Sequence, residues 1–157
     1  MSLKKSLAVL LVLLALFSIR TYFAFTSNLR QFQRNTEFQT ALSDAKWSLE
    51  TTKVLLEEYL LQKSPRAARQ LRMKFDQFKT DPSFSVLENW SGDFSLVPAV
   101  LSKRKDFIYI TELLLSLEAG GGSPELYADS VSQSFLISHE IFSYLIDLSV
   151  QTTEEIT

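Results

Sequence analysis

An apolar run near the amino terminus, residues 7–25, limits most strongly what this chain can fold into. Only Ser18, Arg20 and Thr21 interrupt it, and an apolar helix of about 20 residues crosses the hydrocarbon layer of a membrane. Arg20 lies near the far end, where its long side chain reaches the interface together with neighbouring aromatic rings. We therefore expect a membrane-spanning helix that includes Leu7, Leu11, Leu14, Phe17, Arg20 and Tyr22.

The same run has a second interpretation. Lys4 and Lys5 followed by an apolar core are also typical of a cleavable secretory signal. Such a signal ends in small residues three and one positions before the cut, whereas the pairs available here, such as Tyr22 with Ala24, each include a large aromatic residue. This favours an uncleaved anchor over residues 1–25, with the amino terminus inside and the remainder outside.

The rest of the chain, residues 26–157, is long enough for one domain with a real core. It carries 13 basic and 18 acidic side chains, a net charge of −5, which argues against nucleic acid as a partner. The chain contains no cysteine, so it has neither a disulfide nor a thiolate metal site. That is compatible with an oxidising exterior.

Residues 25–62 contain no glycine or proline, and apolar residues recur there at helical spacing. A second series at intervals of seven, Trp47, Val54 and Leu61, runs beside the first and is expected to widen the buried stripe. The anchor should therefore continue into one long helix that ends near residue 62. The first series comprises Phe25, Leu29, Phe32, Phe38, Leu42, Ala45, Leu49, Leu56, Tyr59 and Leu60.

Serine followed by proline marks the start of further helices at Ser64 and Ser123, because serine caps free amides and proline fits the first turn. We expect helices over 65–79, 96–119 and from 124 onward. Residues 83–95 are expected to be a loop or short helical turn. No segment alternates with period two, so the sequence predicts an all-α chain. Its four amphipathic helices would form an antiparallel four-helix bundle over residues 26–157.

Aromatic residues of the 83–95 segment, Phe84, Trp90 and Phe94, are expected to close one end of the core. At the carboxyl end, the helical pattern is still running at residues 154–157 without a stop signal. We therefore expect this chain to be the amino-terminal portion of a longer protein.

Several short patterns carry a family resemblance. They are Trp47-Ser-Leu-Glu, Leu55-Leu56-Glu-Glu-Tyr59-Leu60, Ser64-Pro65 and Leu71-Arg-Met-Lys-Phe75-Asp76-Gln-Phe78. Together with the basic start and single membrane helix, the chain resembles the extracytoplasmic sensor regions of bacterial transmembrane signalling proteins, chiefly sensor histidine kinases of two-component systems and diguanylate cyclases. The resemblance implies a periplasmic domain on the bacterial inner membrane, with a second membrane helix and an output module beyond residue 157.

Catalytic chemistry is not indicated. His139 is followed by Glu140, but a zinc-protease helix needs a second histidine where Ser143 stands. Residues 120–122 are glycines without the lysine that a phosphate-binding loop requires. We expect no enzyme, no metal and no cofactor within these residues.

A basic segment, residues 63–79, allows two interpretations. Arg66, Arg69 and Arg72 near a helix amino terminus would suit a carboxylate or phosphate ligand. Alternatively, the segment complements the residues from Asp106 onward, which include nine acids and no lysine or arginine. Trp47 and Trp90 similarly could line a pocket for an aromatic or apolar ligand, or could be ordinary core.

The sequence therefore favours a membrane-anchored sensor or input domain, expected to be a homodimer, with a small anionic or aromatic ligand as its signal. A bitopic scaffold protein of an envelope assembly is the first alternative. A secreted helical binding protein, released by cleavage near residue 24, is the second.

Overall fold

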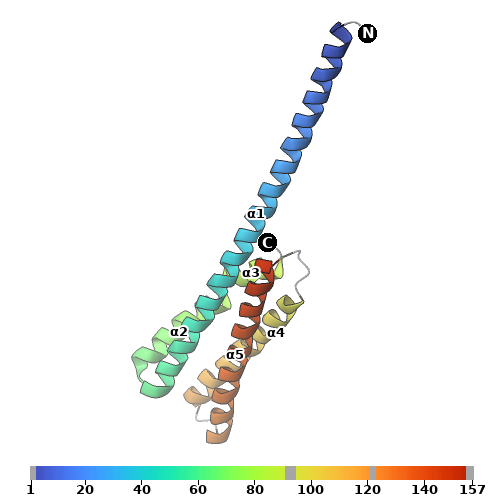
Figure 1. The fold of residues 1–157 in the computed structure, drawn as a ribbon. Coiled ribbons are helices and arrows are strands. Elements are labelled where there is room, and N and C mark those ends of the chain that lie inside the picture. Colours follow the sequence, from blue (N-terminus) through green and yellow to red (C-terminus); the bar gives the residue numbers. More distant parts are fainter. Residues whose placement is uncertain (1–2, 91–94, 121–122, 155–157) are drawn as a thin grey trace. The chain divides into compact units, whose positions relative to one another are not determined.

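The fold is all-helical in a computed structural model that describes residues 3–90, 95–120 and 123–154 (Figure 1). For residues 3–9, 119 and 154 only the helical backbone is described. No strand occurs in these ranges, which confirms the predicted all-α class. The helices are α1 (Leu3–Gln62), α2 (Pro65–Lys79), α3 (Pro82–Glu88), α4 (Leu96–Gly120) and α5 (Pro124–Glu154).

The chain divides into two compact units, Met1–Glu37 and Phe38–Thr157, and helix α1 contains residues of both. In the first unit the apolar side chains are exposed, among them Leu11, Leu14, Phe17 and Tyr22. Arg20 is exposed as well, and Leu7 lies in the helical backbone. By length and composition, α1 is able to cross a membrane through its apolar amino-terminal part.

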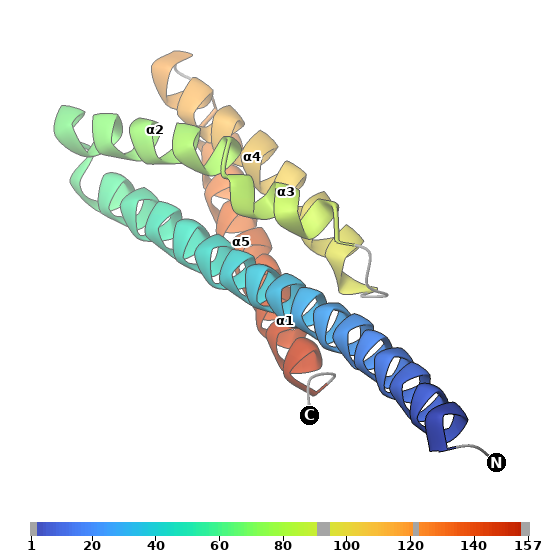
Figure 2. The same ribbon diagram turned by 90° about the horizontal axis from the view of Figure 1, so that it is seen from above.

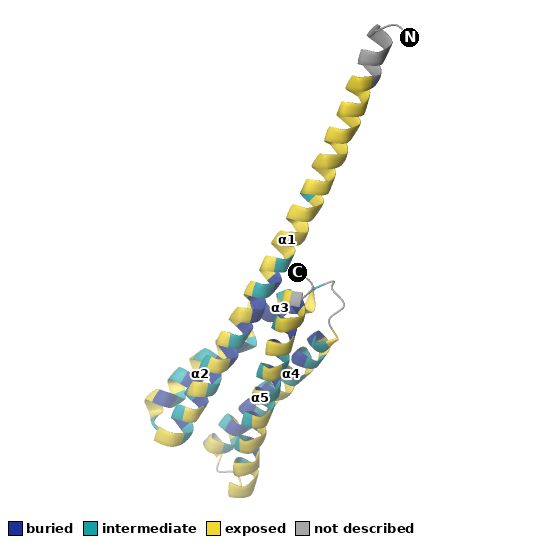
Figure 3. Cartoon of the chain, in the orientation of Figure 1, coloured by how far each residue is buried: buried dark blue, intermediate teal, exposed yellow. Residues whose placement is uncertain are grey.

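The second unit buries one large apolar cluster, to which all five helices contribute. Three phenylalanines meet inside it, since the Phe78 ring centroid lies 5.4 Å from that of Phe84 and 5.5 Å from that of Phe107. Both pairs meet edge to face, the favourable arrangement for aromatic rings. Figure 3 shows the buried positions in dark blue on the inward faces of these helices. A smaller cluster joins Leu56, Tyr59, Ala67, Leu71 and Leu114.

Most of the predicted core residues of α1 are buried, but the second heptad series is not. Trp47, Val54 and Leu61 are 65 %, 50 % and 86 % exposed, so the predicted widening of the buried stripe was wrong. At about 100° per residue, these three side chains point roughly half a turn away from Leu49 and Leu56, which face the core. A seven-residue interval keeps residues on one face, but it does not say which face is covered.

The predicted helix boundaries at the two serine–proline pairs are confirmed. Ser64 has extended backbone angles, and its hydroxyl accepts a hydrogen bond from the Ala67 amide at 3.2 Å. Lys63, just before it, has a φ of 46°, in the left-handed region where an L-residue is disfavoured. The Ser123 hydroxyl accepts from the Leu126 amide at 3.4 Å.

The segment expected as a loop or short turn contains the seven-residue helix α3. Its amino terminus is capped by Asp81, whose carboxylate accepts a hydrogen bond from the Ser83 amide at 2.9 Å. Phe84 is buried in the large cluster and Trp90 packs against it, whereas Phe94 lies outside the described residues.

Helices α4 and α5 pack directly against each other, and Figure 2 shows this pair from above. One ion pair ties them together, with 2.6 Å between Lys103 Nζ and Glu140 Oε2. The face of α5 toward the core carries buried hydroxyl side chains, namely Ser130, Ser134, Ser138 and Thr152. Helix α5 is also tied to α1, since the Gln39 amide donates a hydrogen bond to the Thr152 hydroxyl.

Candidate functional site

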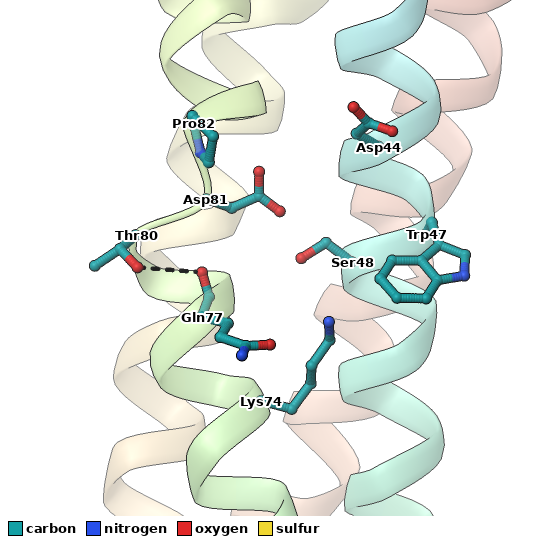
Figure 4. A pocket seen from close by; sticks show the side chains of 8 residues that line it. All are labelled: Asp44, Trp47, Ser48, Lys74, Gln77, Thr80, Asp81 and Pro82. Carbon is teal, nitrogen blue, oxygen red and sulfur yellow. Dashed lines mark hydrogen bonds between the residues drawn. The ribbon is translucent and has the colours of Figure 1, made fainter.

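A groove of about 440 Å³ lies between α1 and α2 and reaches the start of α3 (Figure 4). Helix α1 supplies one wall, α2 supplies the other, and the connection to α3 closes one end. All of its residues belong to the unit Phe38–Thr157. The lining residues are Asp44, Trp47, Ser48, Lys74, Gln77, Thr80, Asp81 and Pro82.

Helical spacing explains why these side chains share the groove. Asp44, Trp47 and Ser48 are separated by three and four residues on α1, so they lie on adjacent turns of one face. Lys74 and Gln77 are three apart on α2 and face them. The groove therefore follows from two short periodic patterns, one on each helix.

Lys74 and Trp47 contact each other across the groove. The Lys74 ammonium nitrogen lies 4.4 Å from the centroid of the Trp47 ring, within the range of a cation–π interaction. Among the residues that the structure describes, Lys74 makes no ion pair with a carboxylate. In Figure 4 its ammonium group points toward Ser48 and Trp47. The groove thus contains a positive charge that is not neutralised by a neighbouring acid.

The carboxylate of Asp81 is held in place by hydrogen bonds. Its Oδ1 atom accepts hydrogen bonds from the amide and the hydroxyl of Ser83, at 2.9 and 2.6 Å, and the Ser48 hydroxyl faces the carboxylate from α1. Burial alone would raise the pKa of Asp81, but the hydrogen bonds from Ser48 and Ser83 and the nearby Arg104 charge outweigh it, so the pKa is lowered. Asp81 is therefore ionised at neutral pH.

Arg104 supports this end of the groove from α4. Its Nη2 atom donates to the carbonyl oxygens of Phe78 and Lys79, at 3.0 and 2.7 Å, and so satisfies the carboxyl end of α2. Burial lowers the pKa of Arg104, and the charges of Asp81 and Glu88 partly oppose that change. Sequence reasoning missed this residue, because Arg104 stands between Lys103 and Lys105 in what looks like an ordinary exposed basic run.

The residues predicted to bind a ligand are not all brought together. Trp47 lines the groove, whereas the lining does not include Arg66, Arg69 or Arg72, which are exposed on α2. Trp90 packs instead on Phe38, with 4.4 Å between ring centroids. An anion site at the three arginines stays a prediction. The basic residue that does line the groove is Lys74, which belongs to the same segment, residues 63–79.

Complementary charge is present at the other end of that segment. Lys79 Nζ lies 2.8 Å from Asp76 and 3.2 Å from Glu112 of α4. The hydrogen bonds to Asp76 and Glu112 raise the pKa of Lys79. Because these groups are exposed, each pair is worth little, at most about 1 kcal/mol.

The side chains that could ligate a metal are dispersed over the described part of the chain. No group of three His, Cys, Asp or Glu residues there is placed to hold a metal ion. His139 is exposed on α5. The groove itself, through Asp44, Lys74 and the Trp47 ring, offers charge and aromatic contact.

Comparison with known proteins gives no match: no family model fits the chain, and neither a curated protein nor a solved structure is significantly similar to it. Function must therefore be argued from the groove and the helices.

Proposed function

We propose that this chain is a membrane-anchored sensor domain, displayed on the outer side of a bacterial inner membrane, that passes a ligand signal to the membrane through α1. One observation carries the proposal. Helix α1 contains the apolar segment that is able to span a membrane, and it also supplies Asp44, Trp47 and Ser48 to the groove. A ligand in that groove would contact the same helix that contains the membrane-spanning segment.

The second unit, in this proposal, is an antiparallel four-helix bundle made by the carboxyl-terminal part of α1, α2, α4 and α5. Short connections at residues 63–64 and 121–123 favour antiparallel neighbours. Helix α3 would cover the end of the bundle near Phe84. A ligand between α1 and α2 would then shift one helix of the bundle relative to its neighbour.

The proposal also includes a homodimer. Trp47, Val54 and Leu61 form an exposed apolar series on the face of α1 opposite the core, at the seven-residue spacing that is typical of paired helices. In a dimer, the partner helix would cover Val54 and Leu61. This would explain why these two apolar side chains are exposed in the single chain.

Membrane topology gives the first test. Because the chain contains no cysteine, a single introduced cysteine reports its side of the membrane without background. We expect Ser143→Cys, at an exposed site on α5, to react with a membrane-impermeant maleimide in spheroplasts, and Ser2→Cys to react only after lysis. The opposite labelling would contradict the proposed location. Release of a soluble product lacking about two dozen residues would favour the secreted protein.

Disulfide cross-linking in native membranes gives the second test. Val54→Cys should form covalent dimers under mild oxidation, whereas Gln62→Cys, about 80° around the helix from Val54, should not. Equal cross-linking at both positions would indicate random collision.

A scaffold protein of an envelope assembly is the second candidate, and the exposed apolar series of α1 supports it equally well. The two functions differ in their response to small molecules. In a sensor, the cross-linking rate of Leu29→Cys should change when the low-mass fraction of a yeast extract is added. An unchanged rate would favour the scaffold.

A further inference from the structure

We propose that the groove between α1 and α2 binds a free α-amino acid with an apolar side chain. This inference deepens the proposed sensor function and rests on it for its biological meaning. The chemistry of the groove carries it, since one cation, one anion and an aromatic ring are each available to a ligand there.

The available cation is Lys74. Its ammonium group rests over the Trp47 ring at 4.4 Å and lies within ion-pair distance of neither Asp44 nor Asp81, the two acids in the lining. A cation–π contact at an exposed site is weaker than a charge-assisted hydrogen bond. A ligand carboxylate would therefore gain the Lys74 ammonium without first breaking an ion pair.

The available anion is Asp44. It lies on α1 one turn before Trp47 and Ser48, it is exposed, and it makes no ion pair among the residues described. Asp81 differs, because its Oδ1 atom already accepts two hydrogen bonds from Ser83. Figure 4 shows the Asp44 and Lys74 side chains toward opposite ends of the groove. A ligand ammonium group would accordingly pair with Asp44.

This set of charges selects a zwitterion over a simple ion. An anion would meet two carboxylates for one ammonium group, and a cation would leave Lys74 without an anionic partner. A molecule with both charges satisfies Lys74 and Asp44 together. The remaining lining surface includes the exposed Trp47 ring and Pro82, which suit an apolar side chain. The volume of about 440 Å³ lies in the range of about 300–1,000 Å³ that is usual for small-molecule sites.

Calorimetric titration of the full chain in detergent micelles tests this inference. The probes are L-leucine and L-phenylalanine. Each is compared with the analogue that lacks the ammonium group (4-methylpentanoate, 3-phenylpropanoate) and with the one that lacks the carboxylate (3-methylbutylamine, 2-phenylethylamine). We expect saturable binding of at least one amino acid and at least about tenfold weaker binding of its two analogues. Absence of binding by both amino acids, or equal binding of a single-charge analogue, would overturn the proposal.

Two substitutions assign the charges to residues. Lys74→Met and Asp44→Asn should each weaken binding of the amino acid at least about tenfold. The matched controls, Lys53→Met and Glu57→Gln, lie on α1 outside the groove and should leave the affinity unchanged. Far-ultraviolet circular dichroism checks that every variant is folded, and Lys74→Arg provides a second variant that should retain part of the affinity.

Unchanged affinity in both folded groove variants would overturn the assignment. These outcomes are separate from those of the sensor proposal. If no amino acid binds but the cysteine variants still report the expected topology and response, only the ligand class is wrong.

Discussion

The guanidinium group of Arg104 lies over the Phe84 ring of α3, with 4.3 Å between its Cζ atom and the ring centroid. The same group donates two hydrogen bonds to the last carbonyls of α2, so one side chain of α4 holds α2 and α3 together at the closed end of the groove. Arginine suits this task because its planar head both stacks on a ring and donates in a fork.

Replacing Arg104 should therefore destabilise the fold. We expect Arg104→Met to lower the free energy of unfolding by about 2–3 kcal/mol, since two charge-assisted hydrogen bonds and one cation–π contact are lost. Lys105→Met, on the exposed side of α4, is the matched control and should change it by less than about 0.5 kcal/mol. Urea unfolding of the full chain in detergent measures both. Equal effects of the two substitutions would contradict the assigned contacts.

Asp81 predicts a dependence of stability on pH. Its pKa is lower in the folded chain than in the unfolded chain, so its contribution is fully present above about pH 4 and is lost as the pH falls through the folded pKa. Asp81→Asn keeps an amino-terminal cap on α3 but removes the charge. We expect this variant to be less stable than the parent at neutral pH, and we expect a smaller difference at a pH below about 4, where the unfolded chain binds the proton more readily than the folded chain.

Urea unfolding at the two pH values measures that difference. Glu57→Gln serves as the control, because Glu57 is exposed on α1 and should show no such convergence. A deficit of Asp81→Asn that is the same at both pH values would mean that shape, and not charge, accounts for the loss.

Thr111 carries a fully buried hydroxyl that has no hydrogen-bond partner among the described residues. Burying an unpaired hydroxyl is unfavourable, and valine has nearly the same shape. We therefore expect Thr111→Val to raise the free energy of unfolding by about 1 kcal/mol.

Thr52→Val is the matched control, because the Thr52 hydroxyl is equally buried but donates to the Ser48 carbonyl at 2.8 Å. Because this hydrogen bond is lost, Thr52→Val should leave the free energy of unfolding unchanged or lower it. Thermal unfolding followed by circular dichroism compares the two variants. A loss of stability in Thr111→Val would show that this hydroxyl finds a partner in solution.

Lys63 joins α1 to α2 with a positive φ of 46°, and its amide donates to the Tyr59 carbonyl at 2.8 Å. Glycine adopts that conformation without the steric cost of a β carbon. We expect Lys63→Gly to be more stable than Lys63→Ala by about 1 kcal/mol. The alanine variant controls for the lost side chain, including the contact of Lys63 Nζ with the Tyr127 ring. Equal stability would indicate that the turn relaxes.

Local signals in the sequence were sufficient for the helices themselves. Ser64 and Ser123 each cap a helix whose first residue is proline, and the apolar spacing of Leu42, Leu49 and Leu56 identified the buried face of α1. The apolar segment with membrane-spanning length was also evident. Such features depend on residues three or four positions apart, which remain neighbours in any helix.

Only the tertiary structure decided which surfaces are covered and which side chains meet. Trp47 belongs to a heptad series that looks like core, yet it is exposed and its ring contacts Lys74 of α2 in the groove between the two helices. Arg104 lies in a basic run but reaches the end of a helix about 25 residues earlier in the chain. Burial and pairing of this kind depend on which helix packs alongside, and spacing within one helix does not contain that information.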